Sequence, residues 1–486
     1  MRILMTASEA APFARTGGLG DVMGALPQAL TKLGHELTVV IPWYKSIPAS
    51  LTTKAKLIES FPVSIANKTF PAEIYSLTIP RTTVTVWLVK GEFHFGRDEL
   101  YRDPETGLDY ADNDARYLFF ARALLQMAND LKSPPDLIHV HDWQTALVPV
   151  LLKYQKDLYH RLSFVKTVIT IHNLGYQGVF PAERFSALGL PAELFHAVTG
   201  PLEFYGKVNF LKGGIVSAHK ITTVSETYAK EIQTSAYGAG LDGVLQSRQD
   251  DLIGIVNGVD YKIWSPTKDK HTPYRFNPAN LGGKRNCRVE LLNEIGLPQR
   301  DGTPLIGIIS RLADQKGFDL IADGAEELLA MDLQLVILGT GEKKYHDLLT
   351  GLANKYPDKL KVILAFDDGL AHRIEAGADI FLMPSQYEPC GLNQLYSLKY
   401  GTVPIVRKTG GLADTVIDWD PVSQTGTGFV FEEYTPEAML EAVSRALELF
   451  ARKRTWMKLA KEGMMADFSW GASAKKYANL FGSLVE

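Results

Sequence analysis

Residues 304–316 read PLIGIISRLADQK, a short apolar run that leads directly into a polar loop with two cations. The arrangement recurs at residues 378–384 (ADIFLMP), which are followed by a loop that contains Glu388. Short apolar runs of this kind are typical of buried strands in a parallel sheet, and the loops after such strands bind ligands in open α/β folds. The pattern predicts a ligand site to which one loop brings Arg311 and Lys316 and the other brings Glu388.

The charges in these two loops indicate the chemistry of the ligand. Arg311 can hold two phosphate oxygens at once, while Lys316 acts as a point charge. Glu388 suits the hydroxyl groups of a sugar, and Gly391 shortly after it can open a helix whose N–H groups donate to a ligand. Together the loops predict an enzyme that binds a nucleotide sugar.

The rest of the chain alternates apolar runs with helical patterns, which is typical of parallel α/β units. The alternation is clearest in the second half, where residues 317–330 fit a crossover helix. The strands expected in the first half are residues 3–7, 37–41, 84–89, 137–140, 167–171 and 220–224, and those in the second half are residues 305–310, 333–338, 361–364, 379–384 and 403–406.

Length and composition restrict the class of protein. The chain has 486 residues, which favours two or three domains, and 46% hydrophobic with 22% charged residues is ordinary for a globular protein. A net charge of −4 gives no general attraction to nucleic acid or to an anionic membrane. Two cysteines and the lack of a signal peptide or an apolar stretch of ~18 residues predict a cytosolic protein with reduced thiols.

A joint between two domains of similar size is expected near residues 253–266 (IGIVNGVDYKIWSP). Asn257 and the glycine after it favour a turn, and Ser265 before a proline disfavours a helix. We therefore predict an N-terminal domain over residues 1–255.

Two similar glycine-rich segments follow strands in the two halves. Residues 16–22 read TGGLGDV, residues 409–416 read TGGLADTV, and a helical stretch follows each. Glycines allow the backbone to approach a ligand, and the N–H groups at the start of a helix favour an anion. Arg15 adds a cation beside the first segment and Asp21 lies in its first helical turn. A plain tight turn is the alternative interpretation of either segment alone.

Polar groups also end two strands of the first half. Residues 139–143 read HVHDW, and residues 171–178 read IHNLGYQG. Alternation places His139 and His141 on one side of an extended chain, but the sequence nominates no third ligand for a metal. We expect His141 or Asp142 to form hydrogen bonds at the strand end, with a purely structural histidine as the alternative.

The sequence indicates neither a cysteine nucleophile nor a pair of catalytic carboxylates. Cys390 has no evident histidine partner, so we expect a small buried residue near the site. Two carboxylates that flank a glycosidic bond, as in a glycosidase, cannot be nominated. A leaving diphosphate can instead assist the incoming hydroxyl, and the protein then supplies positioning and charge stabilisation.

On its motifs the chain resembles the bacterial glycogen synthase and plant starch synthase family over essentially its whole length. The resemblance implies an α/β fold of two Rossmann-like domains (GT-B) that face a deep interdomain cleft. It also implies that the nucleotide-sugar domain spans residues 256–465 and that a helix at residues 466–486 returns to the N-terminal domain. The motifs are RTGGLGDV at 15–22, HDWQTAL at 141–147, TIHNLGYQG at 170–178, EFYGKVNFLKGG at 203–214, NGVD at 257–260, SRLADQKG at 310–317, EPCGLNQLYSLKYGT at 388–402, TGGLADTV at 409–416 and DFSW at 467–470.

The same resemblance implies transfer of glucose from ADP-glucose to the non-reducing end of an α-1,4-glucan, with retention of configuration and without a metal or other cofactor. It implies neither a nucleic-acid nor a membrane partner, and it places the enzyme in the cytoplasm or on glucan granules. The catalytic residues it implies are His141, Arg311, Lys316 and Glu388. The substrate contacts it implies are Arg15, Gly17, Gly18, Asp21, Asn257, Cys390, Gly391, Leu392, Tyr396, Thr409 and Gly410, and the acceptor contacts are Tyr101, His172 and Asn173.

Two positions define where the chain stands among related transferases. Arg15 occupies a position where the family usually has Lys, which keeps the charge and changes the geometry of the cation. Tyr396 lies eight positions after Glu388, where many related glycosyltransferases have a second Glu, and starch and glycogen synthases share this change. The alternatives are a granule-associated starch synthase, a transferase that uses UDP-glucose, a phosphorylase with pyridoxal phosphate, and a glucan-binding scaffold without catalysis.

Overall fold

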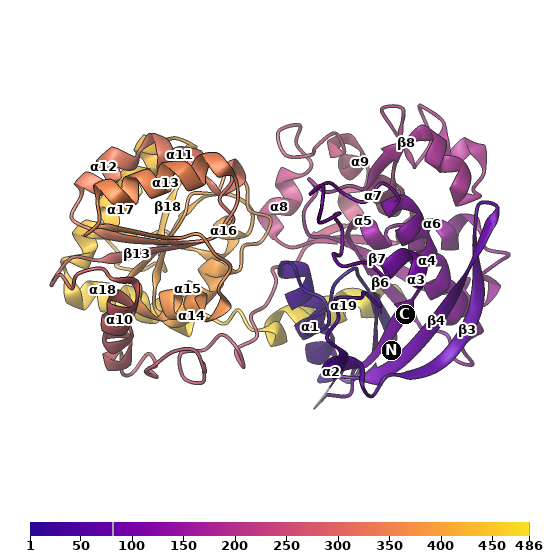
Figure 1. Ribbon diagram of the computed structural model, residues 1–486, viewed down its shortest axis with the longest axis horizontal. Helices are drawn as coiled ribbons and strands as arrows, with labels where there is room; N and C mark the ends of the chain where they lie inside the picture. Colours follow the sequence, from indigo (N-terminus) through magenta and orange to yellow (C-terminus); the bar gives the residue numbers. More distant parts are fainter. Residues whose placement is uncertain (80–81, 486) are drawn as a thin grey trace. The chain divides into compact units, whose positions relative to one another are not determined.

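The computed structural model describes residues 1–79 and 82–485, so residues 80, 81 and 486 of the expected domain ranges lie outside the described residues. The chain divides into two compact units, each with its own sheet (Figure 1). The predicted fold class, α/β with two Rossmann-like parts, is confirmed. Unit 1 contains Met1–Val224, Ala229–Gly258 and Trp470–Glu486, and unit 2 contains Ser225–Tyr228 and Val259–Ser469.

The sheet of unit 1 has the strand order β12-β11-β7-β6-β1-β2-β5-β4-β3. β1 (Arg2–Thr6) pairs in parallel with β2 (Glu36–Pro42) on one side and with β6 (Leu137–His141) on the other. An antiparallel hairpin extends the sheet at one edge. The other strands of unit 1 are β3 (Lys56–Ile65), β4 (Lys68–Thr78), β5 (Thr85–Lys90), β7 (Lys166–Ile171), β11 (Lys220–Thr223) and β12 (Leu252–Gly254), with β8 (Val179–Pro181), β9 (Glu203–Phe204) and β10 (Lys207–Asn209) in a small separate sheet.

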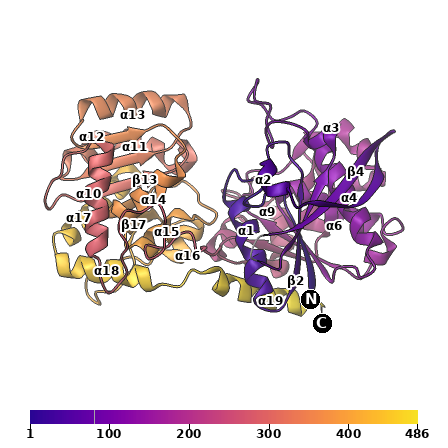
Figure 2. The ribbon, with the colours of Figure 1, turned by 60° about the horizontal axis from the view of Figure 1, so that its bottom comes forward.

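Helices cover both faces of the unit 1 sheet, with α1 (Gly18–Thr31) beside the C-terminal helix α19 (Trp470–Val485) (Figure 2). Tyr477 and Phe481 of α19 are one helical turn apart, and both rings contact His139 of β6. The other helices of this unit are α2 (Ala49–Thr52), α3 (Glu92–Phe95), α4 (Asn113–Asp130), α5 (Asp142–Thr145), α6 (Leu147–Tyr154), α7 (Phe210–Ser217) and α9 (Asp242–Ser247), with 3-10 turns η1 (His160–Leu162), η2 (Ala182–Leu188), η3 (Ala192–Phe195) and η4 (Gln249–Asp251). The residues of α8 (Glu226–Glu231) are divided between the two units.

The sheet of unit 2 is parallel, with the strand order β15-β14-β13-β16-β17-β18. Each half of the sheet grows outward from the centre, which is the doubly wound order of a dinucleotide-binding fold. Its strands are β13 (Leu305–Ile309), β14 (Gln334–Leu338), β15 (Leu360–Ile363), β16 (Ile380–Met383), β17 (Val403–Arg407) and β18 (Phe429–Phe431).

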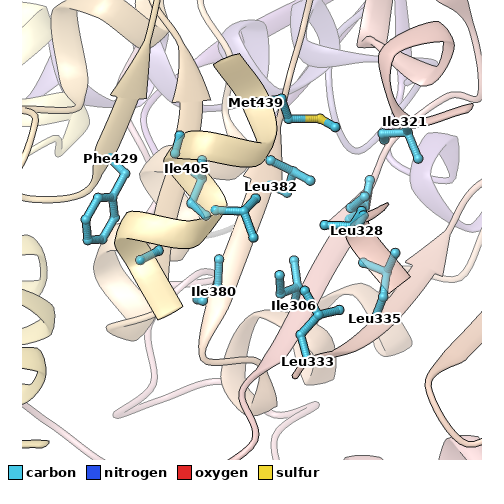
Figure 3. Packing of buried hydrophobic residues seen from close by; sticks show 14 of the residues in the cluster. Ile306, Ile321, Leu328, Leu333, Leu335, Ile380, Leu382, Ile405, Phe429 and Met439 are labelled. Atoms are coloured by element: carbon cyan, nitrogen blue, oxygen red, sulfur yellow. The ribbon is translucent and has the colours of Figure 1, made fainter. Parts of the chain in front are cut away.

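The apolar runs of these strands reflect burial on both faces of the sheet. Ile306 packs in a cluster with Leu382 and Met439 (Figure 3). Its neighbour Leu305 packs on the opposite face of the sheet with Leu291. Helices lie on both sides accordingly (Figure 1). They are α10 (Gly282–Ile295), α11 (Phe318–Asp323), α12 (Ala325–Ala330), α13 (Lys343–Lys355), α14 (Asp368–Gly377), α15 (Asn393–Tyr400), α16 (Gly410–Thr415), α17 (Pro436–Phe450) and α18 (Lys453–Met465), with the 3-10 turn η5 (Asp314–Lys316).

Two local predictions differ from the structure. The crossover helix expected over residues 317–330 is two helices, α11 and α12, because the chain departs from helical geometry at Gly324. The two strands of the β3–β4 hairpin are missing from the predicted set of strands, because this exposed edge of the sheet has no buried apolar run. Among the helices of the described residues, none is both long and apolar enough to cross a membrane.

Candidate active site

The residues predicted to bind phosphate and sugar lie on loops that follow the two central strands of the unit 2 sheet. β13 and β16 are neighbours there, with β14 and β15 on one side and β17 and β18 on the other. Ligands of open α/β folds bind at the carboxyl ends of the strands where the order reverses in this way. The loop after β13 carries Arg311 and Lys316, and the loop after β16 carries Glu388.

Gly317 brings the first of these loops against the second. Its φ of 78° is left-handed, and a Cβ atom at this position would lie 2.1 Å from the carbonyl oxygen of Pro384. Only glycine satisfies both conditions. The loops are further joined where the N–H of Gln386 donates to the carbonyl oxygen of Gln315 at 3.0 Å. This close approach fixes the start of the Lys316 side chain beside the second loop.

Lys316 and Glu388 form an ion pair in which Nζ donates to Oε2 at 2.5 Å. The hydroxyl of Ser385 donates to the same carboxylate oxygen at 3.3 Å. Glu388 is only 6% exposed, so its charge depends on these donors, because a buried carboxylate without a partner is costly. An ammonium group has three N–H donors, so Lys316 can bind a further anion while it keeps Glu388.

Two glycines of the TGGLADTV motif hold the Glu388 loop in place. A Cβ atom on Gly410, whose φ is 44°, would lie 2.0 Å from the carbonyl oxygen of Glu388, and one on Gly411 would lie 2.0 Å from that of Cys390. The N–H of Gly411 donates to the carbonyl oxygen of Glu388 at 3.1 Å. The motif therefore acts as a close-fitting support for the loop after β16, and the preceding Thr409 is buried at the start of α16.

Arg311 is exposed, and one guanidinium nitrogen donates to Oε1 of Gln315 at 2.9 Å. A side chain held in this way at the surface can exchange its partner for a phosphate at small cost. Its position directly after β13 places this cation on the same loop as Lys316.

The residues that begin α15 are tied to the protein by a buried glutamine. The side-chain amide of Gln394 donates to the carbonyl oxygens of Cys390 at 2.9 Å and of Gly391 at 3.1 Å. Gly391 has a φ of 70°, and Leu392 caps the helix. Cys390 is a buried thiol, and Tyr396 packs its ring flat against Trp264 at a centroid distance of 3.9 Å.

The glycine and histidine motifs of unit 1 come from adjacent strands in the same way. β1 and β6 are neighbours, with β2 and β5 on one side and β7 and β11 on the other. The loop after β1 leads through the RTGGLGDV motif into α1, and β6 ends at His141, after which α5 begins. Unit 1 thus has its own switch point, with Arg15 and His141 on the two flanking segments.

Glu9, which the sequence did not nominate, organises the loop after β1. It is 4% exposed and accepts hydrogen bonds from the N–H of Thr16 at 2.5 Å, from the Thr16 hydroxyl at 2.7 Å and from the Tyr101 hydroxyl at 2.6 Å. Because the Tyr101 proton goes to Glu9, the Ser8 hydroxyl donates to the Tyr101 oxygen at 2.7 Å. Burial and the Glu9 charge raise the pKa of Tyr101 well above its usual range.

Arg15 and Asp21 form an ion pair across the start of α1, with Nε of Arg15 2.8 Å from Oδ1 of Asp21. Both side chains are partly exposed, at 40% and 31%. Gly17 is the N-cap of α1 and has no atom within 4 Å of a Cβ built on it, whereas Gly20 packs closely on Arg15. Gly18 begins the helix, so the predicted contacts Arg15, Gly17, Gly18 and Asp21 lie together.

Three histidines line the ends of β6 and β7. Nδ1 of His141 lies 2.9 Å from Nε2 of His172, and Nε2 of His139 lies 2.6 Å from the Thr170 hydroxyl. Burial lowers the pKa of His139 and of His172 to about 3 and that of His141 well below its usual range. All three imidazoles are therefore neutral at physiological pH. His141 is fully buried and His172 is partly exposed above it.

Asp142 connects the two motifs through an unusual backbone conformation. Its φ is 56°, and its Oδ1 accepts a hydrogen bond from the N–H of His172 at 2.7 Å. Burial of the carboxyl group, with a smaller effect from the negative charge of Glu9, raises the pKa of Asp142 to about 7. A left-handed residue other than glycine at a strand end is typical of functional sites.

The remaining predicted contacts of unit 1 are dispersed. Asn173 accepts the N–H of Gly175 at 2.9 Å through its side chain, which shapes the loop after β7. Asn257 is 4% exposed and lies one residue before Gly258, which packs against Trp470. The hydroxyl of Tyr101 is engaged by Ser8 and Glu9, so its hydrogen-bonding atom is directed into unit 1.

Comparison with known proteins identifies the family. The family model of the starch synthase catalytic domain matches residues 2–247, and that of the glycosyl transferases group 1 matches residues 294–462. The chain belongs to the glycogen synthase and starch synthase family. It is a glycosyltransferase with the fold that its sequence predicts.

The relatives of this glycogen and starch synthase family member extend over its full length. A glycogen synthase from Koribacter versatilis is 47% identical over 99% of this chain and 98% of its own, and one from Anaeromyxobacter sp. is 47% identical over 100% of both. The structure of the catalytic domain of starch synthase IV from Arabidopsis thaliana, bound to ADP and acarbose, has a TM-score of 0.89 at 32% identity and covers 99% of both chains. Sucrose-phosphate synthase from Thermosynechococcus elongatus shares the fold, with a TM-score of 0.61 at 17% identity, covering 99% of this chain and 98% of its own.

Proposed function

We propose that this glycogen and starch synthase family member transfers glucose from ADP-glucose to the non-reducing end of an α-1,4-glucan, with retention of configuration. The observation that carries the proposal is the Lys316–Glu388 ion pair at the carboxyl ends of β13 and β16, with Arg311 on the same loop. A buried acid paired with a cation beside a second cation suits a sugar joined to a diphosphate. The Arabidopsis relative is bound to ADP and acarbose, which supports a nucleoside diphosphate and a sugar as the ligands of the proposed site.

In the proposed reaction, the bond between the glucose anomeric carbon and the diphosphate oxygen breaks while the acceptor 4-hydroxyl oxygen bonds to that carbon. The electron pair leaves with ADP, and a phosphate oxygen takes the proton from the acceptor hydroxyl. Lys316 and Arg311 stabilise the charge that grows on the leaving diphosphate. Glu388 holds Lys316, with Oε2 2.5 Å from Nζ, and accepts a hydrogen bond from a sugar hydroxyl. These cations supply the positive charge, and we propose that the transfer needs no metal or other cofactor.

For unit 1 we propose the roles that the sequence motifs imply. Arg15 and Asp21 contact the donor, and the neutral imidazoles of His141 and His172 provide hydrogen bonds to sugar without adding charge. Because His141 is fully buried, with Nδ1 next to His172 and Nε2 without a hydrogen-bond partner among the described residues, its contact with glucose requires a movement of the residues that cover it. Tyr101 and Asn173 are the proposed acceptor contacts.

The proposed partners are ADP-glucose and a glucan such as glycogen, starch or a malto-oligosaccharide. We propose no contact with nucleic acid or membrane, in keeping with the net charge of −4. The proposed location is the cytoplasm, either free or bound to glucan granules.

Product analysis tests this function. Incubation of the purified chain with ADP-glucose and maltotetraose should yield longer malto-oligosaccharides, with one ADP released for each glucose added. Digestion of the products by an α-1,4-specific glucosidase should return glucose. Release of ADP without chain extension would contradict the proposal that an α-1,4-glucan is the acceptor. An absence of both ADP and longer oligosaccharides would favour a glucan-binding scaffold without catalysis.

A further inference from the structure

A second group of chemically active side chains lies in unit 2, outside the residues assigned to the reaction. His271 comes from the loop before α10, and Asp368 and His372 come from α14 (labelled in Figure 1). Each residue offers one ligand atom, and these three atoms lie within 4.8 Å of one another. Two imidazole nitrogens and one carboxylate oxygen are a ligand set for a divalent transition metal.

The helix geometry accounts for two of the three ligands. Asp368 and His372 are four residues apart on α14, so both side chains project from the same helix face. Nε2 of His372 lies 4.0 Å from Oδ2 of Asp368. The imidazole of His271 lies across from them, with its ring centroid 4.9 Å from that of His372. A zinc ion at the usual distance of about 2.0–2.2 Å from each ligand atom requires these atoms to draw together by roughly 1 Å.

A buried carboxylate fixes the imidazole of His372 in the form that binds a metal. Nδ1 of His372 donates to Oδ2 of Asp269 at 2.7 Å, and the Tyr400 hydroxyl donates to the same oxygen at 2.5 Å. With the proton held on Nδ1, the lone pair of Nε2 faces Asp368. A carboxylate that orients a histidine in this way is the usual outer partner of a zinc-binding histidine.

Asp269 also positions the loop that carries the third ligand. Its Oδ1 accepts a hydrogen bond from the N–H of His271 at 2.8 Å. The indole of Trp264 stacks on the His372 ring at 3.6 Å with an interplanar angle of 8°, which restricts rotation of this imidazole. Asp269 thus holds the imidazole of His372 and the backbone of His271, and Trp264 packs on the His372 ring, so part of the order that an ion requires is already present.

The site is open to solvent on the side of His271. His372 is 1% exposed, whereas His271 is partly exposed and Asp368 is exposed. A groove of about 500 Å³ adjoins the loop and is lined by residues that include His271, Thr272, Glu290 and Asn293. The neighbouring Arg373 is paired with Glu294, with Nε 2.8 Å and Nη2 2.7 Å from the two carboxylate oxygens. An ion and a water ligand can therefore enter.

We propose that His271, Asp368 and His372 bind one divalent transition-metal ion of the zinc type, with water as a further ligand. The ion braces unit 2, because it joins the loop before α10 to α14. The ion also limits movement of the rings stacked on His372, which are Trp264 and, 3.9 Å from it, Tyr396. Tyr396 lies on α15, the helix that follows the Glu388 loop. It takes no part in glucosyl transfer, so the proposal does not depend on the proposed function.

The test is a calorimetric titration of the chelator-treated, full-length chain with Zn²⁺ alone, which measures the number of ions bound and their affinity. The expected result is one ion for each chain, with binding weakened at least tenfold in His271→Ala and in Asp368→Asn. Both positions reach the surface, so these substitutions do not disturb the core. His160→Ala and Asp347→Asn remove an exposed imidazole and an exposed carboxylate elsewhere and should bind as the unaltered chain does. Mg²⁺ should not bind at this nitrogen-rich site.

A spectroscopic measurement checks the location independently. Ni²⁺ or Cu²⁺ at His372 should quench the fluorescence of the stacked Trp264, and Trp264→Phe should remove that part of the quenching while one Zn²⁺ still binds. The proposal is overturned if the chain binds no stoichiometric Zn²⁺. It is equally overturned if His271→Ala and Asp368→Asn bind Zn²⁺ as tightly as the unaltered chain.

Discussion

The ammonium group of Lys316 lies 2.5 Å from Oε2 of Glu388, although 72 positions separate the two residues in the chain. The contact exists because β13 and β16 are neighbours in the sheet and because Gly317 allows the two following loops to touch. A buried acid that holds a partly buried lysine keeps the cation in place, and in the proposed reaction this reduces the reorganisation needed in the transition state.

Replacement of either cation should lower the rate of the chemical step more than it weakens donor binding. We expect Lys316→Ala and Arg311→Ala each to reduce kcat for transfer from ADP-glucose by about 10²–10³, since negative charge that is absent from the bound donor develops on the leaving oxygen in the transition state. Steady-state kinetics measure the effect. Lys343→Ala removes an exposed lysine of α13 in the same unit and should leave kcat unchanged. A rise in KM with normal kcat in both cation variants would contradict the assignment.

Gly317→Ala should impair activity without a change in any charged group. The new Cβ atom would meet the Pro384 carbonyl at 2.1 Å in a left-handed conformation, so the loop must shift and take Lys316 away from Glu388. The matched control is Gly351→Ala, at an exposed position of α13 with no atom within 4 Å. That change should stabilise the protein by up to about 1 kcal/mol. Equal kinetics for both variants would show that the loop contact does not position Lys316.

Cys390→Ala should retain kcat within about tenfold, because the proposed reaction forms no covalent intermediate with a nucleophile of the protein. The residue is buried, and its carbonyl oxygen, which remains in the variant, is the group that accepts hydrogen bonds from Gln394. Initial rates of the variant and of the unaltered chain with ADP-glucose measure the effect, once equal melting temperatures have shown that the variant is folded. A loss as large as that expected for Lys316→Ala would point to covalent participation of the sulfur.

Asp142→Asn should stabilise the protein at alkaline pH and have little effect at acidic pH. The raised pKa of about 7 means that folded Asp142 keeps its proton between pH 4 and 7, while the unfolded chain releases it near pH 4. The folded state therefore binds more protons in this window, and stability falls as pH rises through it. Asparagine does not ionise, so the stability of the variant does not fall with pH in this way. Its side-chain oxygen still accepts a hydrogen bond from the N–H of His172, and asparagine tolerates the φ of 56°.

Thermal unfolding at pH 5 and pH 8 measures this difference. The melting temperature of Asp142→Asn relative to the unaltered chain should increase between the two pH values. Asp157→Asn, a change at an exposed carboxylate, serves as the control and should show no such increase. A difference for Asp142→Asn that is the same at both pH values would refute the raised pKa.

Much of the fold could be predicted because the sheet of unit 2 and the central strands of the unit 1 sheet are parallel and buried. A strand covered on two faces, such as β13, has a continuous apolar run that stands out from the polar loop after it. The β3–β4 hairpin could not be found in this way, since its exposed residues outnumber its buried ones and prolines occur in both strands. The break at Gly324 does not follow from the pattern of apolar residues, which continues through it, although glycine has a low helix propensity.

The candidate site could be predicted as a set of loops and not as a set of contacts. Arg311, Lys316 and Glu388 were expected from residue type and from their position after strands. The pairing of Lys316 with Glu388 depends on strand order, which the sequence does not state. Glu9 was missed because it lies outside any motif, and its role appears only when Thr16 and Tyr101 are seen to donate to it.

The most direct test of the central claim is the initial rate of glucose incorporation into glycogen, with ADP-glucose and UDP-glucose compared side by side and Lys316→Ala as the control. The account predicts rapid incorporation from ADP-glucose, a strong preference for it over UDP-glucose despite Arg15, and near-complete loss in Lys316→Ala. A preference for UDP-glucose would contradict the assigned donor. Incorporation that is unaffected in Lys316→Ala would contradict the assigned site.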